Sequence, residues 1–169
     1  MNAKERRAEI LARLRSAEQA VSASRLAGEF SVSRQIIVGD IALLRAAGEE
    51  ITATPHGYVM RTETTGYTCQ VACRHEAAQM QDELNAIVDQ GCTVVDVIVS
   101  HPIYGQLVGA LDLSSRYEVA AFIERSQHED AQPISSLTDG IHLHTIRCPD
   151  EAAAERVRSA LAALGILLA

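Results

Sequence analysis

The chain has 169 residues, of which 47% are hydrophobic and 22% charged, and its net charge is −7. This composition can bury a core, which excludes wholesale disorder, and the length allows one domain or two small ones. No stretch approaches the roughly 20 apolar residues of a membrane span, and the charged segment 1–7 differs from a signal sequence. We therefore expect a cytoplasmic protein without a membrane partner.

The charge is distributed unevenly along the chain. Residues 1–62 carry 9 basic and 7 acidic residues, a net charge of +2, whereas residues 63–169 carry 6 basic and 15 acidic residues, a net charge of −9. A mildly basic front joined to a strongly acidic back predicts two domains with different partners. The overall acidity therefore does not exclude nucleic acid as a partner of the first domain.

The first thirty-three residues have the pattern of two helices and a tight turn. Asn2 and Glu5 have the spacing of a capping box for a first helix. Residues 25–30 predict a short second helix, and residues 31–33 predict a tight turn that ends in a capping serine. Two short helices joined by such a turn are typical of a helix-turn-helix.

The expected third helix would present its amino-terminal end to DNA. Ile37, Ile41 and Leu44 recur at helical spacing and would bury one face. Arg34 and Gln35 lie away from that face, where arginine can contact guanine edges and glutamine adenine edges in the major groove.

A β-hairpin wing is expected after the third helix. Residues 51–54 and 58–61 alternate between apolar and polar side chains around the turn at 55–57. His56 and Arg61 would lie near the phosphate backbone. The alternative is a three-helix protein-interaction module, but the wing favours DNA binding. The expected DNA-binding residues are Arg25, Ser33, Arg34, Gln35, His56 and Arg61.

Beyond a polar linker at 62–66, strands and helices alternate. We expect strands at 67–73, 93–100, 106–113 and 140–147, and helices at 75–90, 115–126 and 150–164. This βαββαβα order predicts a mixed sheet with helices packed on one face. The predicted fold class is α+β, with a winged helix-turn-helix domain at 1–62 and a second domain at 67–169.

Histidines dominate the chemistry of the second domain. In a strand, His142 and His144 project from one face about 7 Å apart, so both imidazoles can converge on one metal ion. Glu83 flanks the apolar stripe of its helix and could supply an oxygen. Eight helical residues rise about 12 Å, so His75 must lean toward Glu83 or belong to the turn before the helix. Spacing alone leaves open a metal site and a solvated or hydrogen-bonded histidine pair.

The four cysteines, at positions 69, 73, 92 and 148, do not form a zinc-ribbon pattern. Cys69 and Cys73 would face one side of a strand about 13 Å apart, too far to share one metal ion. We expect buried, reduced thiols.

Several segments spread over nearly the whole chain carry a family resemblance. They are residues 33–38, 40–41, 44–45, 75, 83–84, 87–89, 96–105, 115–116, 133–135, 137–138 and 140–146. In them the chain resembles the niacin-responsive transcriptional repressor family, in which a winged helix-turn-helix precedes a ligand-sensing domain named for its three histidines.

Two positions depart from the family pattern. Ser31 stands where the family usually has glycine, and Gly39 stands where a longer polar side chain is common. Glycine in a helix interior lowers helix stability by about 1 kcal/mol relative to alanine. Gly39 therefore either allows close approach of the helix to DNA or is a tolerated loss of stability. Both departures concern which operator sequence the protein recognises, and not whether it binds DNA.

The resemblance implies an open-faced sandwich, similar to the histidine-containing phosphocarrier fold, for the second domain. It implies a repressor of NAD-biosynthesis or niacin-uptake genes, with nicotinic acid as corepressor. It also implies one divalent metal ion at His75, Glu83, His142 and His144. Such nitrogen and oxygen donors suit Zn, Ni or Fe(II).

In the resulting mechanism, nicotinate takes an open position of the metal ion through its pyridine nitrogen or its carboxylate. His101, Tyr104 and Arg116 are candidates to bind its other end, with Arg116 suited to the carboxylate. His101 has an alternative role in orienting a metal ligand. We expect a homodimer, because a dimer matches two half-sites of double-stranded operator DNA.

Two other functions remain open at this point. A metal-dependent hydrolase would use Glu83 as its base, but a winged helix has no role in hydrolysis, so we do not expect an enzyme. A metal-responsive repressor would need no organic effector.

Overall fold

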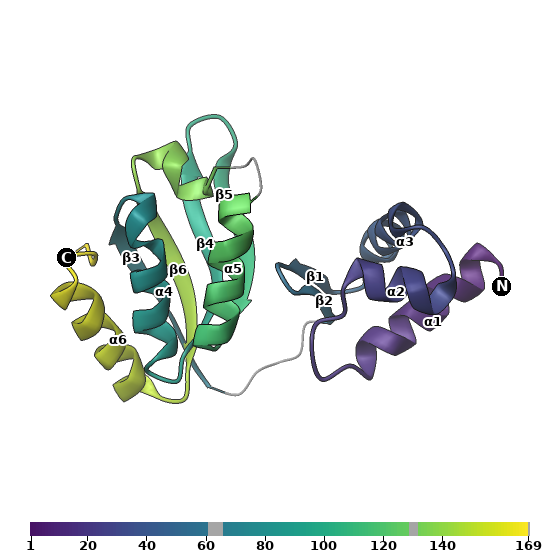
Figure 1. Cartoon of the computed structure of the whole chain (residues 1–169), viewed down its shortest axis with the longest axis horizontal. Coiled ribbons are helices and arrows are strands. Elements are labelled where there is room, and N and C mark those ends of the chain that lie inside the picture. The colour runs from purple at the N-terminus through teal and green to yellow at the C-terminus, as the bar shows by residue number, and fades with distance from the viewer. Residues whose placement is uncertain (61–65, 129–131, 169) are drawn as a thin grey trace. The chain divides into compact units, whose positions relative to one another are not determined.

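The computed structural model describes residues 1–60, 66–128 and 132–168, and the chain divides into two compact units, residues 1–64 and 65–169 (Figure 1). Arg61 and residues 62–65 of the expected linker lie outside the described residues. None of the described helices is both long and apolar enough to cross a membrane.

The first unit is a winged helix-turn-helix, as predicted. Its elements are α1 (Ala3–Arg15), α2 (Ala23–Phe30), α3 (Arg34–Ala46), β1 (Ile51–Thr54) and β2 (Gly57–Met60). The capping box is present, because the Asn2 side chain accepts a bond from the Glu5 amide and the Glu5 carboxylate accepts one from the Asn2 amide. The Ser33 hydroxyl caps α3 by accepting a 3.3 Å bond from the Ile36 amide.

Backbone contacts attach the wing to the helices. Tyr58 exchanges two 2.9 Å backbone hydrogen bonds with Val21, in the segment between α1 and α2. Gly57 has a φ of +133°, and a β-carbon there would lie 2.5 Å from the Val21 carbonyl. Only glycine therefore allows this close approach.

A buried ion pair joins α1 to α3. Asp40 is 4% exposed, and its carboxylate accepts bonds from the Arg6 side chain at 2.6 Å and the Arg7 side chain at 3.3 Å. These arginines therefore stabilise the unit internally.

The turn between α2 and α3 contains a residue in the left-handed region. Ser31 has a φ of 53°, a conformation that costs a non-glycine residue roughly 1–2 kcal/mol. This explains in physical terms why glycine suits the position.

The second unit is an open-faced sandwich, as predicted. Its elements are β3 (Tyr67–Arg74), η1 (Ala77–Gln79), α4 (Met80–Val88), β4 (Thr93–His101), β5 (Gly105–Leu113), α5 (Arg116–His128), η2 (Ile134–Thr138), β6 (Ile141–Cys148) and α6 (Glu151–Ala163). Helices α4, α5 and α6 cover one face of the sheet, with α4 in contact with both others (Figure 1).

The sheet has the order β3-β6-β4-β5, and every neighbouring pair is antiparallel. The prediction of a mixed sheet was wrong. Strands β3 and β4 do run parallel, but β6 lies between them, so they never pair. The core between sheet and helices includes Val71, Leu84, Ile87, Val94, Leu113, Ile146, Val157 and Leu161.

Replacing Gly39 should stabilise α3. A β-carbon at this position would meet no atom within 4 Å, and no positive φ opposes it. We expect Gly39→Ala to raise the free energy of unfolding of the first unit by about 1 kcal/mol, measured by hydrogen exchange of the α3 amides. Lower protection would contradict this expectation. An accompanying loss of DNA affinity would show that the bare α-carbon is needed beside DNA.

Candidate metal centre and ligand pocket

The predicted metal ligands come from three segments of the second unit. Glu83 lies in the first turn of α4, whereas His75 lies in the segment between β3 and η1. The predicted helix at 75–90 therefore begins too early, since its first turn is the separate η1, and His75 belongs to the turn before the helix. His142 and His144 lie on β6 and both are buried.

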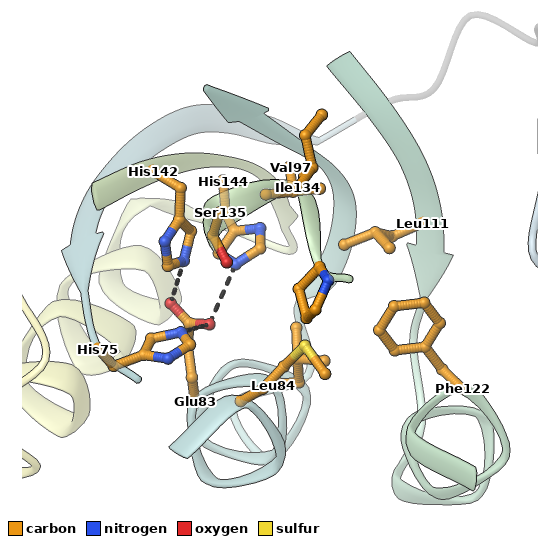
Figure 2. A pocket seen from close by; sticks show the side chains of 12 residues that line it. His75, Glu83, Leu84, Val97, Leu111, Phe122, Ile134, Ser135, His142 and His144 are labelled. Carbon is orange, nitrogen blue, oxygen red and sulfur yellow. Dashed lines mark hydrogen bonds and ion pairs between the residues drawn. The ribbon is translucent and has the colours of Figure 1, made fainter. Parts of the chain in front are cut away.

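The structure brings these four side chains together around the Glu83 carboxylate (Figure 2). The Nε2 atom of His75 lies 2.6 Å from Oε2, that of His142 lies 2.9 Å from Oε1, and that of His144 lies 3.2 Å from Oε2. Glu83 is 1% exposed and the histidines are 3–8% exposed. The four residues thus form one buried polar cluster.

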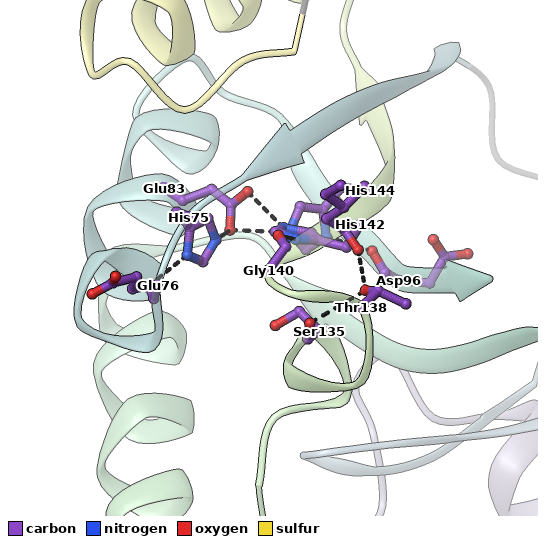
Figure 3. Close-up of polar contacts among 10 residues, drawn as sticks. His75, Glu76, Glu83, Asp96, Ser135, Thr138, Gly140, His142 and His144 are labelled. Carbon is purple, nitrogen blue, oxygen red and sulfur yellow. Dashed lines mark hydrogen bonds and ion pairs between the residues drawn. The ribbon is translucent and has the colours of Figure 1, made fainter. Parts of the chain in front are cut away.

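The opposite ring nitrogen of each histidine faces a backbone carbonyl (Figure 3). His75 Nδ1 lies 2.7 Å from the Glu76 oxygen and His142 Nδ1 lies 2.8 Å from the Gly140 oxygen. His144 Nδ1 lies 2.7 Å from the oxygen of Asp96. A carbonyl only accepts, so each Nδ1 carries a proton, and any of the three rings that is neutral therefore turns its Nε2 lone pair toward Glu83.

The arrangement of three imidazoles around the Glu83 carboxylate favours binding of a cation. Lone pairs of neutral imidazoles facing a carboxylate repel it. Protonation of one imidazole would balance the single charge of Glu83 but would leave the lone pairs of the other two facing it. His144 Nε2 is buried without a hydrogen-bond partner among the described residues, because its contact with Glu83 lacks hydrogen-bond geometry. A divalent ion would satisfy all four donors, and backbone carbonyls on the second nitrogen are typical of metal-bound histidines.

The charges of the cluster are coupled. Burial by itself raises the pKa of Glu83, but the three surrounding imidazoles stabilise the ionised carboxylate when they are protonated, and they lower that pKa well below its usual range. Burial lowers the pKa of His75, but the hydrogen bond and the charge of Glu83 outweigh it and raise that pKa. Glu83 is therefore an ionised carboxylate that binds positive charge. Three imidazole nitrogens and one carboxylate suit Zn, Ni or Fe(II).

An apolar pocket with a cavity volume of about 70 Å³ adjoins the cluster (Figure 2). Besides the four polar residues, its lining consists of Met80, Leu84, Val97, Leu111, Phe122, Pro133, Ile134 and Ser135. None of these described lining residues is lysine or arginine. The positive charge that attracts an anion to the pocket would therefore have to come from a metal ion at the cluster.

The three residues predicted to bind the other end of nicotinate are not among the described residues that line this pocket, and their role as ligand contacts stays a prediction. His101 and Tyr104 lie at the β4–β5 turn, where His101 Nδ1 accepts bonds from the amides of Ile103 and Tyr104. Arg116 begins α5 and forms a bidentate ion pair with Asp89 at 2.6 and 2.7 Å. Each side chain therefore has a local partner.

The expected DNA-binding residues lie on two parts of the first unit. Arg34 and Gln35 are exposed at the start of α3. Arg25 pairs with Glu29 on α2 at 3.1 Å, and Ser33 uses its hydroxyl as a helix cap. His56 is half-buried in the wing turn, and Arg61 lies outside the described residues.

Comparison with known proteins agrees with both units. A helix-turn-helix domain matches residues 6–59 and a 3H domain matches residues 68–169. The probable transcription repressor NiaR of Thermotoga maritima is 42% identical over 164 residues, which cover 97% of this chain and 94% of that protein. The transcription repressor NadR of Bacillus subtilis is 40% identical over 167 residues, which cover 96% of this chain and 93% of that protein.

The chain belongs to this 3H-domain transcription repressor family. The relatives bear out the resemblance, and their names agree with a protein that is not an enzyme.

Two residues of this 3H domain were missed from the sequence. Gly140 has a φ of +83°, and its carbonyl accepts bonds from His142 Nδ1 and from the His75 amide. Cys73 lies beside Glu83 and His142, although it was expected to be only a core thiol. The register of β3 against β6 places it there, and no local sequence signal reveals that register.

Replacing Gly140 should disrupt the candidate metal centre. A β-carbon would lie 2.2 Å from the His75 carbonyl oxygen, so Gly140→Ala must displace His75. We expect metal affinity, measured by calorimetry with Zn²⁺ or Ni²⁺, to fall about 10–100-fold. The matched control is Gly105→Ala, which has a φ of +70° but meets no atom within 4 Å. Equal affinities for the two variants would contradict this prediction.

Proposed function

We propose that this chain is a metal-containing, cytoplasmic repressor that binds operator DNA as a homodimer in response to nicotinic acid. It would thereby control NAD-biosynthesis or niacin-uptake genes. The observation that carries the proposal is the orientation of three buried imidazoles, each with Nδ1 on a backbone carbonyl and Nε2 toward Glu83. One divalent transition metal, Zn, Ni or Fe, would be held by His75, Glu83, His142 and His144.

The pocket suits a small aromatic acid. Leu84, Val97 and Phe122 provide apolar contacts for a flat ring, and Ser135 adds a hydroxyl at the side near the histidines. A divalent ion at the cluster would supply positive charge and an open position for the carboxylate or the pyridine nitrogen of nicotinate. The described lining offers no arginine or lysine for that carboxylate. Metal and nicotinate should therefore bind cooperatively.

The segment η2 connects the pocket to the metal centre. Ile134 and Ser135 line the pocket, and the Ser135 carbonyl accepts a 3.0 Å bond from the Gly140 amide. A ligand that contacts η2 would therefore bias the turn that positions His142. In a dimer, a change in this unit would alter the spacing of two recognition helices and so the affinity for paired half-sites.

The effector response should require the buried carboxylate. We expect nicotinate to raise the affinity of metal-loaded protein for promoter DNA at least about 5-fold, the lower range of allosteric coupling, and to leave chelator-treated protein unchanged. Glu83→Ala should abolish this response, measured by fluorescence anisotropy. Asp82→Ala is the matched control, because Asp82 is the preceding acid on α4 and is exposed. Nicotinamide serves as the uncharged ligand control.

Other outcomes separate the alternatives. A metal-dependent but nicotinate-independent change in DNA affinity would favour a repressor that responds to metal alone. Identical DNA binding with and without metal and nicotinate would contradict the proposal.

Sequence readout should depend on the start of α3. We expect Arg34→Ala to weaken binding to the operator by about 1–3 kcal/mol, because a bidentate base contact is lost. Arg45→Ala near the end of α3 is the control. An equal loss of affinity for operator and random DNA would instead assign Arg34 to the phosphate backbone.

A further inference from the structure

Strands β3 and β6 each bring donor atoms to the same buried face. His142 and His144 stand two residues apart on β6, and Cys73 precedes His75 by two residues at the end of β3. Cys73 pairs directly with His142 in the antiparallel register. Directly opposed residues project from the same face, so the thiol points toward the histidines and α4.

The thiol is close enough to take part in metal binding. Cys73 Sγ, a carboxylate oxygen of Glu83 and a ring nitrogen of His142 all lie within 4.8 Å of one another. Two donors bound to one ion at roughly 2.0–2.3 Å are at most about 4.6 Å apart, so a small side-chain movement suffices. The cysteine is 0% exposed, which excludes bulk water as a competing ligand at this side.

We propose that Cys73 is an additional, sulfur ligand of the metal centre formed by His75, Glu83, His142 and His144. This inference rests on the proposed metal centre and adds a donor of a different class to it. Coordination would form a metal–sulfur bond, and the thiol proton would be released to solvent.

A sulfur donor would change which ions the centre prefers. A centre of three imidazoles and one carboxylate can bind Mn²⁺ in addition to borderline ions. A thiolate ligand would raise the affinity for Zn²⁺ and Cd²⁺ relative to the affinity for Mn²⁺. The ratio of Cd²⁺ to Mn²⁺ affinity therefore reports on the sulfur, independently of DNA binding.

The test is the absorption spectrum of full-length protein titrated with one equivalent of Co²⁺. We expect visible bands of a bound ion together with a near-ultraviolet sulfur-to-cobalt charge-transfer band. Cys73→Ser should remove the charge-transfer band, keep the visible bands and lower the Cd²⁺ to Mn²⁺ affinity ratio at least about 10-fold. Cys69→Ser is the matched control, because Cys69 lies on the same strand but pairs with Ile146, away from the donors.

The outcomes distinguish this inference from the metal centre itself. Visible bands without a charge-transfer band in the natural chain, or a charge-transfer band that survives Cys73→Ser, would overturn the role of Cys73 and leave the centre intact. Failure of Co²⁺, Zn²⁺ and Ni²⁺ to bind would overturn both. If Cys73→Ser does not fold, Cys73→Val tests the same band with an apolar side chain of similar size.

Discussion

The second unit is organised around a carboxylate that is removed from water. Glu83 lies buried among three imidazoles, and each imidazole is oriented by a carbonyl from a different segment. An unpaired buried charge is costly, so these contacts constrain α4, the end of β3, β4 and the η2–β6 turn together. A cation at the cluster would relieve the remaining repulsion, and metal binding would therefore stabilise the fold.

Sequence patterns could predict the elements but not how the strands combine. The capping box of α1 and the helical spacing of Ile37, Ile41 and Leu44 in α3 are local signals, and the structure confirms both helices. The mixed sheet was wrong because the position of β6 between β3 and β4 depends on the whole unit. The start of α4 was misplaced because η1 interrupts the helix and Gly140 anchors His75 from 65 positions away in the chain.

The same division applies to the site. His142, His144 and Glu83 could be proposed from spacing, because strand and helix periodicity are local. Arg116 was predicted as a ligand contact because its charge suits a carboxylate, and no sequence pattern showed that it forms an ion pair with Asp89, 27 residues earlier. Cys73 was overlooked because its neighbour His142 is adjacent only through strand register. Chemistry that depends on a distant partner is invisible until the pairing is known.

The charge asymmetry acquires a physical meaning from these contacts. Five arginines of the first unit form ion pairs with acids of the same unit, namely Arg6, Arg7, Arg13, Arg15 and Arg25. The 9 basic residues of this unit therefore overstate the cations available for phosphate, and phosphate contacts supply most non-specific DNA affinity. One such winged helix should bind DNA weakly, so the proposed homodimer would raise the affinity by joining two copies. That dependence on assembly would give the acidic domain control over DNA binding, because it would need only to alter how two recognition helices are spaced.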